Sequence, residues 1–312
     1  MRIVSLDSIK SVLPNIDLLS EIESGFAAYS SGLVVVPPVG ELSFQSPPGD
    51  VHIKYGYVKD DDVYVIKIAS GFYENKLKNL PVGNGMMLVF SQKTGEPLAV
   101  LQDECYLTDV RTAVAGAIAA KHLSPKDVDC IGVVGTGVQA KLQLKYLKKV
   151  INCNQALVWG RSSDSLLTYK ESTNHYNYQI ETTENIDDII SRCQLIVTCT
   201  PSEEPLISMI NPGTHVTAIG SDTTTKRELS SSVLFKADTV VTDSKSQSTE
   251  RGEIYQASKD GFLSSSVLEL GNIVKGEVKG RINEEQITIA DLTGVAIQDI
   301  QISKAILRSL QE

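Results

Sequence analysis

The sequence predicts an α/β fold with two domains. Its 312 residues, 42% of them hydrophobic, are enough to form two buried cores. From residue 129 onward, short apolar strands alternate with helical segments, which is typical of a parallel sheet covered by helices on both faces. Residues 33–101 instead show mainly strand-like patterns. We therefore expect a β-rich α+β domain followed by a Rossmann-type, doubly wound parallel sheet.

The first domain is predicted to span residues 1–122 and to serve in substrate binding and dimerisation. Apolar residues at helical spacing indicate a helix over 17–29. Strands are expected at 51–55, 63–68, 85–90 and 98–101, followed by a helix over 108–122 that stops before Ser124-Pro125. Because the strands are strongly apolar, we expect this domain to form a homodimer.

The second domain is predicted to span residues 123–295 and to bind a dinucleotide. Its expected strands are 131–134, 156–159, 179–181, 195–199, 215–219, 239–242 and 287–290. A closing helix over 296–310 follows, and we expect the C-terminal segment 296–312 to return to the first domain.

A glycine-rich segment, Gly135-Thr136-Gly137-Val138-Gln139-Ala140, matches G-x-G-x-x-A. It stands between the apolar run 131–134 and a helical run expected over 141–150. The first glycine allows a tight turn, the second lets a pyrophosphate approach the backbone, and the small third residue lets the helix pack on the strand. The free N–H groups of that helix would face the phosphates. An ordinary strand-to-helix turn is the alternative.

The residues after the strand 156–159 bear on the choice of cofactor. An NAD site usually places Asp or Glu here, but this strand ends in Gly160-Arg161-Ser162. A carboxylate would repel a 2′-phosphate, whereas an arginine flanked by hydroxyl groups would bind it. We therefore expect NADPH, with NADH left open as a second cofactor. The alternative is that Arg161 is a solvated loop residue and that Asp164 binds the ribose.

Two cations in the first domain are candidate substrate ligands. Arg111 is expected in the first turn of the helix 108–122, after Thr108 as N-cap, where a bound anion would offset its unfavourable place at the helix dipole. An ion pair with Asp109 or Glu104 is the alternative. Lys67 lies inside an apolar strand, where a buried lysine needs a partner. Exposure at the strand end is the alternative for Lys67, and Lys54 is a candidate to join it.

Two residues at predicted strand ends complete the site. Asp222 follows the strand 215–219, and ligands in doubly wound sheets bind beyond the carboxyl ends of the strands. We therefore expect Asp222 to meet the nicotinamide and the substrate. Thr200, just after the strand 195–199, is a further expected cofactor residue. Gly220, before Asp222, indicates a close backbone approach.

Composition excludes several classes of function. A net charge of −9 and a pI near 5.1 disfavour nucleic-acid binding, which needs basic patches. The five cysteines include no C-x-x-C pair and indicate reduced thiols rather than disulfides or a zinc site. The four scattered histidines disfavour a catalytic metal. With no signal-like or membrane-spanning apolar run, a cytoplasmic protein without membrane contact is expected.

The chain resembles the ornithine cyclodeaminase and mu-crystallin family over nearly its whole length. The most specific segments are residues 107–113, 135–140, 218–222 and 292–299. The resemblance implies that Lys67 binds substrate, that Arg111 holds its carboxylate, and that Asp222 is the acid–base residue. It also implies cofactor contacts for Asn84 and Arg111, and a place near the nicotinamide for Val295.

Two departures from the family pattern stand out. Gly40 takes the place of a usual arginine, and Lys54 lies close to a usual methionine and could supply the missing charge. Gly160-Arg161 resembles the NADPH-using ketimine reductases more than the cyclodeaminase branch, which keeps NAD bound.

The expected function is therefore NADPH-dependent reduction of a cyclic imine carboxylate, with 1-pyrroline-2-carboxylate to L-proline as the most concrete version. Asp222 is the expected proton donor, and a hydroxyl group from a loop at 43–46 is a weaker candidate. The first alternative is ornithine cyclodeamination, an NAD-dependent lyase reaction favoured by Asp222 and Lys226. The second is a non-catalytic, NADPH-dependent binding protein of the mu-crystallin type.

Overall fold

The computed structural model describes residues 1–173 and 176–311 and divides into two compact units. Unit 1 comprises Met1–Arg111 and Val295–Glu312, and unit 2 comprises Thr112–Gly294. The first division falls inside helix α3 (Tyr106–Leu123), and the second falls just before helix α11 (Ala296–Ser309). The C-terminal helix therefore belongs to the same unit as the first strands of the chain.

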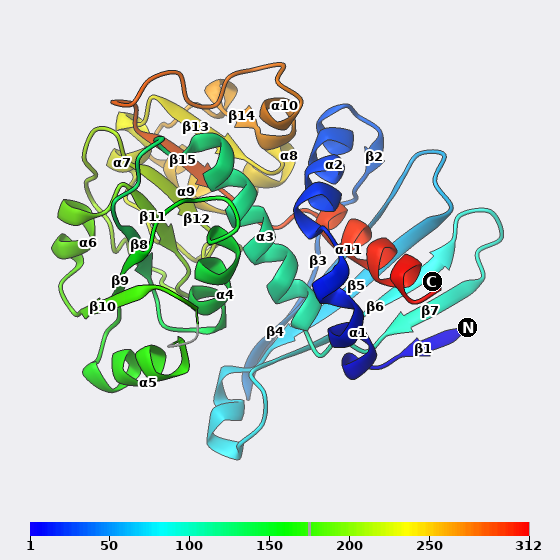
Figure 1. Ribbon diagram of the computed structural model, residues 1–312. Coiled ribbons are helices and arrows are strands. Elements are labelled where there is room, and N and C mark those ends of the chain that lie inside the picture. Colours follow the sequence, from blue (N-terminus) through cyan, green and yellow to red (C-terminus); the bar gives the residue numbers. More distant parts are fainter. Residues whose placement is uncertain (174–175, 312) are drawn as a thin grey trace. The chain divides into compact units, whose positions relative to one another are not determined.

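Unit 1 is built on one mixed sheet with the strand order β1-β7-β6-β5-β4-β2, and β3 pairs with β4 (Figure 1). Only the β1–β7 pair is parallel among the strand pairs of this described sheet. The strands are β1 (Arg2–Val4), β2 (Val34–Val35), β3 (Gly40–Gln45), β4 (Pro48–Val58), β5 (Val63–Gly71), β6 (Gly83–Ser91) and β7 (Pro97–Leu101).

The two faces of this sheet differ because neighbouring residues of a strand point to opposite sides. One face carries Val65, Met87 and Val89, which are buried, and helix α11 packs over it against β4, β5 and β6. Helix α2 (Leu18–Ser30) packs in turn on α11, and α1 (Leu6–Val12) also contacts α11. Lys67 shares the covered face with Val65, so its charged end is enclosed.

Unit 2 is a parallel sheet of eight strands in the order β10-β9-β8-β11-β12-β15-β13-β14. The bounds are β8 (Ile131–Val134), β9 (Gln155–Trp159), β10 (Gln179–Thr183), β11 (Leu195–Thr198), β12 (His215–Ala218), β13 (Thr239–Thr242), β14 (Leu268–Glu269) and β15 (Thr288–Asp291). The strand order reverses between β8 and β11. Ligands of doubly wound folds bind at such a switch point, beyond the carboxyl ends of the strands.

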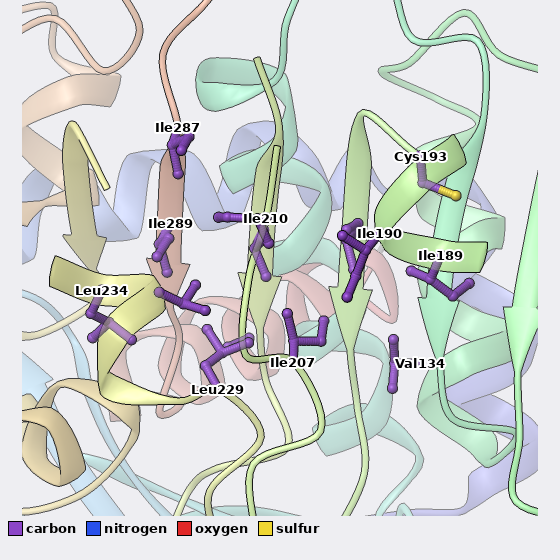
Figure 2. Packing of buried hydrophobic residues seen from close by; sticks show 14 of the residues in the cluster. Val134, Ile189, Ile190, Cys193, Ile207, Ile210, Leu229, Leu234, Ile287 and Ile289 are labelled. Atoms are coloured by element: carbon purple, nitrogen blue, oxygen red, sulfur yellow. The ribbon is translucent and has the colours of Figure 1, made fainter. Parts of the chain in front are cut away.

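Helices connect the successive strands of unit 2 except β11 and β12, and they bury its sheet (Figure 1). They are α4 (Val138–Leu147), α5 (Ser163–Thr173), α6 (Ile186–Arg192), α7 (Ser231–Lys236), α8 (Lys245–Ser248), α9 (Glu253–Lys259) and α10 (Leu270–Val274). Figure 2 shows part of the apolar cluster that results, with Ile189 and Ile190 of α6 and Ile287 and Ile289 at β15 among its members. Burial of such branched side chains supplies the main driving force for folding.

The predicted fold class is confirmed, and its expected strands are all present with small shifts of their ends. The sequence analysis missed β1, β2, β3, β14 and helix α1. The predicted loop at 43–46 was wrong in part, because Ser43 lies in β3, where it pairs with Asp50 of β4. The helix expected from residue 141 begins at Val138, because Gly137 is its N-cap.

Candidate active site

A buried ionic cluster in unit 1 joins residues that are far apart in the sequence. Lys67 of β5 places its Nζ 3.3 Å from Oδ2 of Asp299. Arg111 places its Nε 3.1 Å from Oδ1 of the same carboxylate and donates from Nη1 to Oε1 of Gln298 at 3.0 Å. Lys67 is 2% exposed, Arg111 is 5% exposed and Asp299 is 1% exposed. One carboxylate therefore lies between two cations.

Burial and pairing act in opposite directions on Lys67. Removal from water lowers the pKa of Lys67 below its usual value, and the neighbouring Arg111 also lowers it, whereas Asp299 raises it. Asp299 lies in the first turn of α11, where the helix dipole also favours a negative charge. The carboxylate thus stabilises the charged lysine in an otherwise apolar place. Exposure of Lys67 at a strand end, the alternative from the sequence, is wrong.

Lys54 belongs to the same region of the sheet. It is the register partner of Lys67 across the β4–β5 pair, and it is buried. Two ammonium groups directly opposite each other on neighbouring strands repel each other. A nearby anion would offset this repulsion. The register thus brings Lys54 beside Lys67, as the sequence analysis anticipated.

The segment before α3 sets the direction of Arg111. Glu104 and Cys105 both have left-handed backbone conformations, with φ of 52° and 69°, which are unusual for residues with side chains. This turn brings the buried Asp103 over the start of the helix, where its Oδ2 accepts the N–H of Leu107 at 2.8 Å. Burial raises the pKa of Asp103 to about 6. Asp103 therefore caps the helix that carries Arg111.

One expectation about this helix was wrong. Thr108 is not the N-cap, because α3 begins at Tyr106 and Thr108 lies within its first turn. Arg111 pairs with Asp299, a partner that the sequence did not indicate and that packing of α11 brings to it. In the sequence, Asp299 ends the segment 292–299 that carries part of the family resemblance, but no role was assigned to it.

The glycine-rich loop of unit 2 has the features that a dinucleotide site requires. Gly135 follows β8 with φ of +129°, and a Cβ there would lie 3.0 Å from Cys199 Sγ and 3.4 Å from Thr200 Cγ2. A Cβ on Gly137 would instead meet nothing within 4 Å. Gly137 is also the N-cap of α4. Because glycine has no side chain, it provides no side-chain acceptor for the first N–H groups of this helix. The residues present therefore fit a pyrophosphate bound at this helix end.

The loop after β9 lies against the glycine-rich loop. A Cβ on Gly160 would come 2.8 Å from Cγ2 of the Thr136 side chain, so the lack of a side chain at Gly160 leaves room for it. Arg161 and Ser162 follow and are exposed, and Ser162 accepts the N–H of Ser165 at the start of α5. Asp164, the alternative ribose ligand, is exposed in the first turn of α5. Arg161 thus directly follows the glycine that lies against the glycine-rich loop.

Asp222 lies four residues beyond the end of β12 and pairs with a cation. Its Oδ1 is 2.7 Å from Nζ of Lys226, and its backbone carbonyl accepts from Nη1 of Arg251 at 3.4 Å. The ammonium group stabilises the negative charge of the Asp222 carboxylate. Gly220 is tightly enclosed as expected, but the close atom is the carbonyl oxygen of Thr200 rather than a ligand.

The predicted site residues thus form two groups, one in each unit. Unit 1 holds the cationic group with Lys54, Lys67 and Arg111, and it also holds Asn84 of β6 and Val295, the N-cap of α11. Unit 2 holds the glycine-rich loop, Arg161, Ser162, Thr200 and Asp222. Among the described residues, no cluster of three or more His, Cys, Asp or Glu side chains could hold a metal ion. No helix in the described ranges is long and apolar enough to span a bilayer.

The sequence model of the ornithine cyclodeaminase/mu-crystallin family matches residues 3–312. The chain belongs to this family. It is 36% identical to an uncharacterized cyclodeaminase of Sinorhizobium fredii, with 100% of this chain and 96% of that protein aligned. NAD(P)-dependent cyclic imine reductases and cyclodeaminases are found among the members.

Solved structures of family members share the fold. An archaeal alanine dehydrogenase dimer with bound NAD has a TM-score of 0.91 at 30% identity, covering 100% of this chain and 96% of that one. The Delta(1)-pyrroline-2-carboxylate reductase of Thermococcus litoralis, solved with NADH and L-proline, has a TM-score of 0.93 at 27% identity, covering 100% and 98%. These likenesses extend over both units.

Proposed function

We propose that this protein reduces 1-pyrroline-2-carboxylate to L-proline with NADPH. The buried cationic cluster is the observation that carries the substrate class. Lys67 and Arg111 share one carboxylate, so a negatively charged substrate group would balance the remaining positive charge. Lys54, directly across the sheet, adds to the positive potential. A small imine that carries a carboxylate meets this requirement.

The cofactor preference rests on Arg161. This arginine follows β9 beside the glycine-rich loop, at the place where an NAD site usually has a carboxylate. A guanidinium group there favours the 2′-phosphate of NADPH. The solved relatives named above hold NAD or NADH, so we propose NADPH as the preferred cofactor and NADH as a weaker one.

The reduction adds a hydride to the imine carbon and a proton to the imine nitrogen, and the nicotinamide supplies the hydride when it is bound. Arg111 and Lys67 would hold the substrate carboxylate and thereby orient the ring. Asp222 would stabilise the protonated imine nitrogen or deliver its proton, and Lys226 fixes the position of the Asp222 carboxylate. Ser43, now placed in β3, remains the weaker candidate for the proton donor.

Ornithine cyclodeamination is the second candidate, and the ion pair between Asp222 and Lys226 favours it. A carboxylate oriented by a neighbouring ammonium group is suited to accept a proton from an amino acid. A third possibility is binding of a dinucleotide without turnover.

One set of assays separates these candidates. The purified protein is given NADPH or NADH with 1-pyrroline-2-carboxylate, and separately NAD with ornithine. We expect NADPH oxidation with the imine and no release of ammonia from ornithine. Arg161→Ala should raise the KM for NADPH about 10-fold or more and leave the KM for NADH nearly unchanged. Ammonia release alone, or dinucleotide binding without either reaction, would overturn the proposal.

We also propose a homodimer built on unit 1. The sheet face opposite α11 carries Tyr55, Tyr57 and Met86, all exposed, and the adjoining hairpin strand adds exposed Leu42 and Phe44. A contiguous apolar patch on a sheet marks an interaction surface. Light scattering at micromolar concentration should give the mass of two chains, whereas a monomer would refute this proposal. Tyr57→Glu should weaken the association.

A further inference from the structure

The side chain of Glu228 is fully buried and accepts four hydrogen bonds. Its Oε1 accepts from the backbone N–H of Thr200 at 2.6 Å and from the hydroxyl group of Thr200 at 2.8 Å. Its Oε2 accepts from the hydroxyl group of Thr198 at 2.8 Å and from the backbone N–H of Gly220 at 2.9 Å. The two backbone N–H groups require an acceptor and the two hydroxyl groups also donate, so the carboxylate form satisfies all four contacts. Burial opposes this form and raises the pKa of Glu228 to about 7.

The four donors lie at the carboxyl ends of two neighbouring strands. Thr198 ends β11 and pairs in register with Ala218, the last residue of β12. Beyond this point the strands no longer pair, and the Glu228 carboxylate bridges the two segments that leave the sheet. The approach is close, because a Cβ on Gly220 would lie 2.2 Å from the carbonyl oxygen of Thr200. The bridge therefore fixes both segments at the carboxyl ends of β11 and β12, next to the switch point between β8 and β11.

Both segments lead to the candidate cofactor site. Thr200 contacts the glycine-rich loop, since its Cγ2 lies 3.4 Å from the position of a Cβ on Gly135. Gly220 is two residues before Asp222. A single side chain thus contacts both the segment that packs against the glycine-rich loop and the segment that leads to the proposed acid–base residue.

Helix α9 holds the backbone of Glu228 in place. Its backbone N–H donates to Oε1 of Glu253 at 2.6 Å, and the N–H of Leu229 donates to Oε2 at 3.1 Å. Glu253 is the first residue of α9, and its side chain is also buried. A buried polar network in which the backbone groups are satisfied is rigid. Glu228 consequently has little freedom to follow a displaced loop.

We propose that Glu228 is a positioning residue for the dinucleotide, holding Thr200 and Gly220 so that the glycine-rich loop and Asp222 meet the cofactor correctly. This inference rests on the dinucleotide site proposed above. Glu228 touches neither substrate nor cofactor in this role and acts only through the two loops. Displacement of such groups by about 1 Å costs up to about 100-fold in function.

The test compares Glu228→Gln with Asp238→Asn as a matched control. Glutamine keeps the size of the side chain, but its amide nitrogen cannot accept the two hydrogen bonds made by one carboxylate oxygen. Asp238 likewise accepts a backbone N–H, that of Ile287 at 2.8 Å, but just before the amino end of β15. Binding of NADPH is measured by quenching of Trp159, the single tryptophan, alongside thermal unfolding of the free protein.

We expect Glu228→Gln to weaken NADPH binding about 10- to 100-fold, whereas Asp238→Asn keeps normal affinity. The KM for NADPH should rise while the KM for the imine stays within about twofold, because unit 1 cations set the latter. Normal NADPH affinity in a folded Glu228→Gln protein, even one of lower thermal stability, would overturn the inference. If that variant does not fold, Thr198→Val decides, since it removes one donor, and unchanged affinity there overturns the inference as well.

The same measurements separate a failure of the dinucleotide site from a failure of the proposed reaction. A wild-type protein that binds neither NADPH nor NADH refutes the dinucleotide site and this inference with it. A wild-type protein that binds NADPH but does not reduce the imine refutes only the proposed reaction, and the affinities of the variants still decide the role of Glu228.

Discussion

Removing the charge of Asp299 should strongly destabilise unit 1. The carboxylate lies 3.3 Å from Lys67 and 3.1 Å from Arg111, and all three side chains are buried. At an effective dielectric constant of about 20, each attraction at this distance amounts to roughly 5 kcal/mol before the cost of desolvation. Breaking a buried pair by removing one partner typically costs about 3–5 kcal/mol. We expect Asp299→Asn to lose that much free energy of unfolding near pH 7.

The loss should shrink as the pH rises. Burial already lowers the pKa of Lys67, and Asp299 opposes that change. Without the carboxylate the folded-state pKa of Lys67 falls further below its unfolded value of about 10.4. Because the unfolded chain then binds more protons than the folded one, stability rises with pH, and in the variant the rise begins at a lower pH. The gap between the two proteins should therefore narrow as the pH rises toward the unfolded-state pKa of Lys67, about 10.4.

Urea unfolding of both proteins at several pH values measures this effect. The surface ion pair between Glu21 and Arg308 provides the control, and Glu21→Gln should cost less than about 1 kcal/mol with little dependence on pH. A loss below about 1 kcal/mol for Asp299→Asn, or a gap that stays constant with pH, would refute the reasoning. Either result would mean that the two cations are stabilised without this carboxylate.

Three further predictions concern unit 2. Gly137→Ala should change stability by less than about 0.5 kcal/mol, because its Cβ meets no atom within 4 Å, yet it should weaken NADPH binding in a titration; normal binding would argue against a pyrophosphate there. Asp222→Asn should lower turnover about 10²–10⁴-fold with little change in NADPH affinity, and near-normal turnover would direct attention to Ser43 as proton donor. Burial lowers the pKa of His215 to about 3, so below the unfolded value of about 6.5 the unfolded chain takes up the proton and stability falls with falling pH. Between pH 7 and pH 5 His215 should account for about 2 kcal/mol of lost stability in urea unfolding. His215→Gln should lack this component and His122→Gln should retain it, and equal slopes in the two variants would contradict the assignment.

Local patterns in the sequence were sufficient for the main elements of both units. The alternation of apolar strands and helices after residue 129 predicted the parallel sheet, and Gly135 and Gly137 marked the turn where the strand order reverses. Short strands such as β2 and β14, with two residues each, carry too few residues for a pattern to show. The strand β3 was missed because its pairing with β4, rather than its own composition, defines it.

The sequence by itself placed Lys67 in an apolar strand and Arg111 in the first turn of a helix, and it marked both as candidate ligands of an anion. The sequence could not identify the carboxylate that pairs with these two cations. Asp299 is 188 residues from Arg111 in the chain and meets it only when α11 packs on the sheet. Likewise, Glu228 is an unremarked polar residue in the sequence and becomes a bridge only where β11 and β12 end side by side. Periodicity reports the face on which a residue lies, whereas ion pairs and hydrogen bonds between distant segments depend on tertiary packing.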